Sequence, residues 1–202
     1  NASVIVYGET YNTVQNKQDK PLSTRPKLSD FDVVDYGKRL TALAEHCSTE
    51  GVPLTFHHHM GTAVETEDEL DQLMANTGDS VGLLLDTGHL VFAGGDNSRV
   101  IGNHGRRITH FHTKDIRADV LANIDKTRQS FLDCVLEGIF TVPGDGMIDY
   151  FSIMNQLYTA RYEGWVIIEA EQDPKKANPF DYAKMGYNAL NDALKAAGYS
   201  LQ

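Results

Sequence analysis

Short apolar runs alternate with longer amphipathic stretches along this chain. The apolar runs predict strands at about 3–8, 53–57, 81–86, 108–112 and 165–169. The stretches between them predict helices at about 32–49, 67–76, 150–160 and 180–197, and a helical insertion at about 119–137. Strands that alternate with helices are typical of an α/β fold with a parallel sheet.

Two of the predicted helices show a clear buried face. In the helix at 32–49 that face carries Leu40, Leu43, Ala44 and Cys47, and Gly51 stands where a left-handed residue ends a helix. In the last helix a stripe of small and apolar side chains is expected to face the core. Its members are Met185, Ala189, Ala193 and Ala197.

Five strand-helix units fit two architectures. A closed (β/α)8 barrel needs eight such units and about 250 residues, whereas this chain has 202. An open doubly wound sheet is the alternative. It usually carries a glycine-rich loop after its first strand, and neither GxGxxG nor GxxxxGK[ST] occurs here. The nucleotide-binding interpretation therefore loses its main support.

Charge narrows the range of partners. The 18 Lys and Arg residues against 28 Asp and Glu residues give a formal net charge of −10. An acidic surface repels nucleic acid and anionic membranes, and no apolar run approaches the roughly 20 residues of a membrane span. Cys47 and Cys134 lie in helical patterns and are expected to be free, buried thiols, as in a cytoplasmic protein. The sequence leaves a homo-oligomer open.

Histidine and carboxylate residues gather where the predicted strands end. They are His57, His58 and His59 on the second strand, Asp86 and His89 after the third, His110 and His112 on the fourth, and Glu169 and Glu171 on the fifth. Side chains alternate across a strand, so His57 shares a face with His59. The carboxyl ends of parallel strands meet at one edge, where imidazole and carboxylate without cysteine suit Mn²⁺, Co²⁺, Fe²⁺ or Zn²⁺.

Several neighbouring residues have both a structural and a functional interpretation. Glu65 precedes an acidic run that complements the start of a helix, and it also lies close to the end of the second strand. Lys114 and Asp115 follow the fourth strand and either pair with neighbours or contact a substrate. Glu9 ends the first strand and either points to the same edge or away from it.

Several segments together resemble the xylose-isomerase-like TIM barrels. They are 85–89 (LDTGH), 110–115 (HFHTKD), 143–146 (PGDG) and 168–173 (IEAEQD). Segments 21–26 (PLSTRP), 57–62 (HHHMGT), 140–146 (FTVPGDG) and 169–174 (EAEQDP) resemble more specifically the inosose dehydratase (2-keto-myo-inositol dehydratase) family. The resemblance spans nearly the whole chain. It implies a single domain over residues 1–202 that holds strands four to eight of a TIM barrel, with the first three strand-helix units outside it.

The resemblance also implies a metal site. The superfamily holds one divalent metal with Glu, Asp, His and Glu from four successive strands. Asp86, His112 and Glu169 match the last three by position. His57 stands where the first Glu belongs, so the fourth ligand is His57, His59 or Glu65.

The implied reaction is removal of water from 2-keto-myo-inositol in inositol catabolism, assisted by Mn²⁺ or Co²⁺ and associated with glutathione. Glu169 or Glu171 takes a proton, and His89 or a histidine of the 57–59 run protonates the leaving hydroxyl. Glu65 is a further catalytic candidate. The residues expected to contact the keto-inositol are His59, Lys114 and Glu9.

Three other interpretations compete with this one. A sugar isomerase or epimerase of the same barrel type would return the proton to another carbon instead of expelling a hydroxyl. A DNA-repair endonuclease of this barrel type needs a basic face, which the charge of −10 opposes. A truncated chain that folds and binds metal but has no activity is the third. A product assay separates these alternatives.

Overall fold

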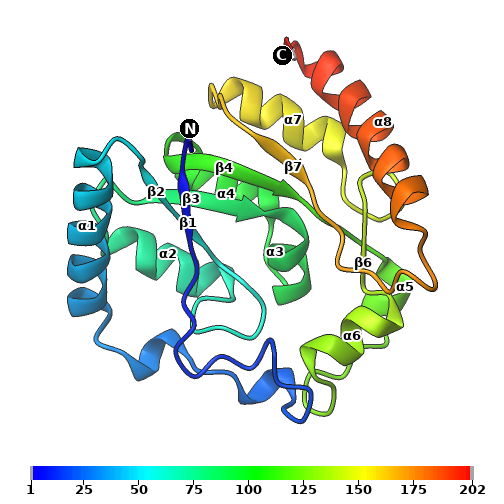
Figure 1. Ribbon diagram of the computed structural model, residues 1–202, viewed down its shortest axis with the longest axis horizontal. Helices are drawn as coiled ribbons and strands as arrows, with labels where there is room; N and C mark the ends of the chain where they lie inside the picture. Colours follow the sequence, from blue (N-terminus) through cyan, green and yellow to red (C-terminus); the bar gives the residue numbers. More distant parts are fainter. Residues whose placement is uncertain (1, 201–202) are drawn as a thin grey trace.

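Five parallel strands form a single curled sheet in the computed structural model, which describes residues 2–200. The strands are β1 (Ile5–Tyr7), β2 (Leu54–His57), β3 (Gly82–Asp86), β4 (Ile108–Thr113) and β7 (Val166–Ile168), and they pair side by side in that order. Figure 1 shows the sheet curling like part of a barrel, with helices around its outside. This confirms the α/β prediction and the TIM-barrel type over the doubly wound alternative.

Five helices connect the strands or follow them, and they cover the outer face of the sheet (Figure 1). They are α1 (Val33–Thr49), α2 (Glu67–Ala75), α4 (Asn97–His104), α7 (Tyr150–Thr159) and α8 (Pro179–Ala197). Polar side chains fix where they begin: Asp32 caps α1, and Thr66 forms a capping box with Glu69 on α2. Gly51, with φ of +83°, follows α1 as predicted.

A separate layer lies at the carboxyl end of the sheet. It consists of α3 (Thr87–Ala93), α5 (Ala118–Leu121), α6 (Phe131–Glu137) and the antiparallel pair β5 (Asp115–Ile116) and β6 (Phe140–Thr141). Its core contains Phe92, Ile116, Phe131 and Phe140, and is distinct from the larger core between the sheet and the outer helices. Short 3-10 turns lie at Leu22–Thr24, Leu28–Asp30 and Gly105–Arg107.

The structure corrects three predictions about helices, which concern the insertion, α1 and α8. The insertion at 119–137 is two short helices rather than a continuous one, because Asp125 closes a turn with Thr127 and Ser130 starts α6 with a capping box. Leu43 is exposed while Leu40 and Ala44 are buried, so the buried face of α1 is narrower than predicted.

The buried stripe of α8 is displaced from its predicted position. Met185 is exposed, and the buried residues are Gly186, Leu190, Ala193, Leu194 and Ala197. Gly186 lies against Val142, Pro143 and Ile168, so its missing side chain is what lets α8 approach the sheet.

The two cysteines are free, Cys134 buried and Cys47 half-buried. Within residues 2–200, none of the helices combines the length and apolar character that crossing a membrane requires.

Candidate metal centre

Three ligand-type side chains converge at the carboxyl ends of β3, β4 and β7. Asp86 is the last residue of β3 and pairs in register with His112 of β4, while Glu169 directly follows β7. His112 Nδ1 lies 3.3 Å from Glu169 Oε2 and 3.6 Å from Asp86 Oδ2. One ligand atom from each residue lies within 4.8 Å of the other two. The structure thus brings together the three residues that the resemblance implies as metal ligands.

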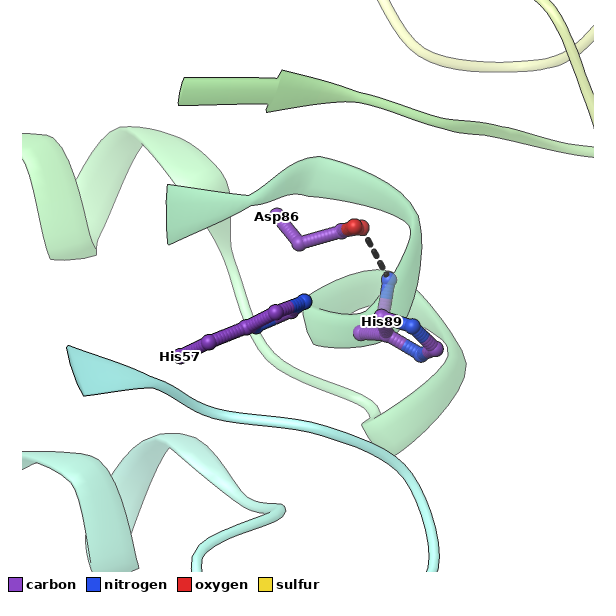
Figure 2. A group of neighbouring side chains, drawn as sticks. All are labelled: His57, Asp86 and His89. Carbon is purple, nitrogen blue, oxygen red and sulfur yellow. Dashed lines mark hydrogen bonds between the residues drawn. The ribbon is translucent and has the colours of Figure 1, made fainter. Parts of the chain in front are cut away.

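Two of the ligand-type atoms at this point, Asp86 Oδ2 and His112 Nδ1, are buried and lack hydrogen bonds to other described residues. Asp86 Oδ1 accepts a hydrogen bond from the His89 backbone N–H at 2.9 Å and caps α3, as Figure 2 shows. Its other oxygen, Oδ2, has no hydrogen-bond partner among the described residues, and neither does His112 Nδ1. Buried polar atoms are normally satisfied. Neighbouring nitrogen and oxygen atoms without hydrogen bonds are suitable ligands for a divalent cation such as Mn²⁺, Co²⁺ or Zn²⁺.

His57 is well placed to be a fourth ligand. It comes from the end of β2, and its ring lies beside Asp86 and His89 in Figure 2. These three residues form a second group whose ligand atoms lie within 4.8 Å, and the ring centroids of His57 and His112 are 5.2 Å apart. Burial holds the pKa of His57 well below its ordinary value. The ring is therefore neutral, as a ligand must be.

A third group contains His59, His89 and Glu171, again with ligand atoms within 4.8 Å. His59 Nδ1 lies 2.8 Å from the Met60 carbonyl oxygen, which only accepts, so Nδ1 carries the proton and Nε2 keeps its lone pair. The side chain of Glu171 is 35% exposed and faces the solvent side of this group.

Lys114 lies between the two carboxylate-bearing groups. Its Nζ is 3.0 Å from Glu169 Oε2 and 2.8 Å from Glu171 Oε2. It also lies 3.0 Å from His89 Nε2 and 3.5 Å from Asp86 Oδ2. Although burial lowers the pKa of Lys114, the surrounding carboxylates raise it above the ordinary value. The site therefore contains a permanent internal cation.

Charge sets the protonation of the remaining groups. Burial raises the pKa of Glu169, but His112 and Lys114 outweigh it and lower that pKa to about 2. Burial likewise lowers the pKa of His112, yet contacts with Asp86 and Glu169 raise it to about 9. Burial keeps His89 neutral by holding its pKa well below the usual range. A proton on His112 therefore compensates part of the negative charge that a metal ion would neutralise.

The structure places Glu65 and Glu9 elsewhere. Glu65 is buried, accepts a hydrogen bond from Gly61 N at 2.7 Å, and pairs with Arg25 Nε at 3.2 Å. Glu9 accepts a hydrogen bond from Tyr11 N at 2.7 Å and lines a different hollow with Tyr7 and Arg39. Neither belongs to the ligand-type groups found among the described residues.

Sequence reasoning missed the residues that support this site. The Phe131 ring centroid lies 5.4 Å from that of His59, and the Phe140 centroid lies 5.2 Å from that of His89. Tyr150 Oη lies 2.7 Å from Thr87 Oγ1 and donates to the Lys114 carbonyl oxygen at 3.0 Å. These aromatic residues are indistinguishable in sequence from ordinary core residues, so no local pattern identifies their role.

Comparison with known proteins gives a consistent result. The family model described as xylose isomerase-like TIM barrel matches residues 17–199. The chain is 49% identical to the rhizopine catabolism protein MocC of Rhizobium meliloti, over 98% of this chain and 61% of that protein. It is 43% identical to an inosose dehydratase of Geobacillus thermodenitrificans, over 90% of this chain and 62% of that protein. The chain thus spans about three fifths of the length of these relatives.

Solved structures agree on the fold. The IOLI protein, described with a binding zinc atom, superposes with a TM-score of 0.65 at 19% identity, over 98% of this chain and 65% of that one. The 3-keto-D-glucoside 4-epimerase YcjR from E. coli gives a TM-score of 0.59 at 17% identity, over 94% of this chain and 63% of that one.

Proposed function

This chain belongs to the xylose isomerase-like TIM barrel family, and we propose that it forms the metal-binding part of a hydro-lyase that removes water from a keto-inositol. The convergence of Asp86, His112 and Glu169 from adjacent parallel strands carries the proposal. Similarity to inosose dehydratases, 43% identity in one case and 46% in another, supports the substrate class.

The three converging residues would hold the ion, with His57 as the fourth ligand. A bound divalent ion such as Mn²⁺ or Co²⁺ supplies a Lewis acid that polarises a substrate ketone. Asp86 and Glu169 provide the anionic oxygens, and both have pKa values below their ordinary range, so both are ionised at neutral pH. His57 is neutral and presents Nδ1 without a hydrogen-bond partner among the described residues.

Dehydration requires a proton to leave the carbon next to the ketone and a hydroxyl to leave the carbon after it. Glu171 is the base in this proposal, because it lies beside the proposed ligands Asp86, His112, Glu169 and His57 without being one of them, and its side chain is 35% exposed and so within reach of a substrate. The proton then passes to His59, whose Nε2 carries a lone pair, and from there to the departing hydroxyl. The C–H and C–O bonds break, a C=C bond forms, and water is released.

The test is a product assay on 2-keto-myo-inositol. The protein is first freed of metal with a chelator and then supplied with Mn²⁺ or Co²⁺, with and without glutathione, while ultraviolet absorbance follows the conjugated product. We expect absorbance that depends on metal and is lost in Asp86→Asn. The matched control is Asp71→Asn, whose carboxylate pairs with His104 away from the site. An epimerised product would favour an isomerase or epimerase instead, and no product with either metal would contradict the proposal.

A further inference from the structure

The candidate site offers ligands for more than one cation. Asp86, His112 and Glu169 form one set, while His59, His89 and Glu171 form another that shares no residue with it. Metal pairs in enzymes lie about 3.5–4 Å apart, each with its own ligands and often with bridging ones. Two adjacent ligand sets therefore raise the question of what limits the number of ions.

The Lys114 ammonium lies against the second ligand set. Lys114 Nζ is 3.0 Å from His89 Nε2 and 2.8 Å from Glu171 Oε2, so it contacts two of the three residues of the second set. The same nitrogen reaches the first set at Glu169 Oε2, 3.0 Å away. Its position is that of an ion bridging two sites.

The position of Lys114 is built into the fold. Its side chain is only 1% exposed, and its Nζ lies 5.0 Å from the centre of the Phe140 ring. Its backbone is held by Thr87 and Tyr150, both of which bond to the Lys114 carbonyl oxygen. A side chain at Gly88 would meet Lys114 Cβ at 2.8 Å, so a glycine there lets α3 pack closely on the lysine. These contacts leave the ammonium little freedom to move away.

The charges of the three carboxylates and the ammonium are balanced by one divalent ion. Three carboxylates contact Lys114, those of Asp86, Glu169 and Glu171. The single ammonium leaves two of these negative charges, which equals the charge of one divalent ion. With two divalent ions and the ammonium the site would carry a net charge of +2.

We infer that Lys114 is the fixed second cation of this site, filling the position that His59, His89 and Glu171 would offer to a second divalent ion and so limiting the centre to one. The inference rests on the metal centre of the proposed function. It predicts that removal of the ammonium uncovers a second metal site.

The test counts bound Mn²⁺ by equilibrium dialysis with elemental analysis and by electron paramagnetic resonance. Wild-type protein should hold one ion even when Mn²⁺ is in large excess. Lys114→Met, which removes the ammonium and is one atom shorter than lysine, should hold two ions with the signal of an exchange-coupled pair. Adding His59→Ala to Lys114→Met should return the count to one. Lys126→Met is the matched control, because this half-buried lysine donates to the Phe92 carbonyl outside the site, and it should stay at one ion.

The outcomes separate this inference from the proposed function. Two ions in the wild type, or one ion in folded Lys114→Met, would overturn the role of Lys114 while leaving a metal centre in place. No ion in the wild type would refute the metal centre itself. If Lys114→Met does not fold by circular dichroism, the wild-type count in excess Mn²⁺ still decides, since a second bound ion there contradicts the inference.

Discussion

The two carboxylate oxygens of Asp86 have different roles: one stabilises the fold and the other is a candidate metal ligand. Oδ1 caps α3 through the His89 N–H, whereas Oδ2 has no hydrogen-bond partner among residues 2–200. Asp86→Asn retains a capping oxygen but loses the anionic ligand. Mutating a residue that only hydrogen-bonds to a metal ligand lowers metal affinity by about 10–100-fold. Loss of the ligand itself should therefore weaken Mn²⁺ binding by about 100-fold or more. Calorimetric titration measures the change, and an unaltered Kd for Mn²⁺ would show that Asp86 is not a ligand.

His112 should make metal binding depend on pH. Its pKa of about 9 in the metal-free protein means that a proton must leave before Nδ1 can coordinate. Mn²⁺ affinity is therefore expected to rise about tenfold per pH unit from pH 6.5 and to level off near pH 9. Titrations in buffers of different ionisation enthalpy should show about one proton released per ion at pH 7. Flat affinity over this range would show that His112 is not a ligand.

The same raised pKa affects the stability of the metal-free protein in the opposite direction. A histidine whose pKa is higher in the folded than in the unfolded state stabilises the fold when it is protonated. The contribution of His112 is thus complete below about pH 6.5 and disappears as the pH rises through about 9.

The ion pair between Arg25 and Glu65 indicates that Glu65 stabilises the fold and is not a metal ligand. The Arg25 side chain is buried with Glu65 and Glu69, at 3.2 and 3.0 Å. Arg25→Met leaves the buried Glu65 carboxylate and the partly buried Glu69 carboxylate without their cation, and we expect a loss of about 3–5 kcal/mol in the free energy of unfolding. Urea denaturation measures it. The folded variant should bind Mn²⁺ like the wild type. Loss of Mn²⁺ binding would instead indicate that Glu65 contributes to the metal site.

Residue types at strand ends predict which side chains gather, but not which of them pair. Asp86, His112 and Glu169 could be predicted because strand polarity alone brings their positions to one edge. Glu65 looked equivalent in sequence. Its partner Arg25 lies far earlier in the chain, and no local spacing reveals that pairing.

At the scale of elements, two glycines in helices offer a matched comparison. A side chain at Gly37 in α1 would overlap the carbonyl oxygen of Asn76 at the end of α2, whereas Gly102 in α4 faces open space. Gly102→Ala should stabilise the protein by about 0.5–1 kcal/mol through helix propensity. Gly37→Ala should destabilise it by about 1–3 kcal/mol, as overpacking does. Thermal unfolding of both variants tests this, and equal melting temperatures would contradict the close helix contact.

The strands of the main sheet and the longer helices follow from the sequence, whereas α3 (Thr87–Ala93) and α4 (Asn97–His104) were not predicted and packing between elements could not be. The ends of α1 and α2 agree with prediction to within about a residue because Asp32 and Thr66 are recognisable caps. The buried stripe of α8 was misplaced because Gly186, which carries no hydrophobic signal, marks the point of closest approach to the sheet. The antiparallel pair β5–β6 was missed because each strand has only two residues.

Taken together, residues 2–200 form an open sheet. Within the described residues, β1 and β7 each have one unpaired edge, and Ile5 and Val6 on β1 are exposed. Unpaired edges with apolar side chains promote association. We expect sedimentation velocity to show self-association that grows with protein concentration and weakens in Val6→Lys. A single species at every concentration would contradict this expectation.

The overall fold could be inferred from strand-helix alternation and from segments that resemble a known family, since both extend over most of the chain. The acidic charge of −10 adds an argument against nucleic-acid partners but does not identify a substrate. The arrangement of Lys114 among three carboxylates has no sequence signature, because its partners come from the ends of β3 and β7.

The most direct test of the metal centre is the location of a bound ion. Crystals of the protein grown or soaked with Mn²⁺ should show an anomalous difference peak bounded by the Asp86 and Glu169 carboxylates and the His112 imidazole. A peak at any other place, or no peak at a Mn²⁺ concentration that saturates binding in solution, would contradict the proposed centre and the hydro-lyase chemistry built on it.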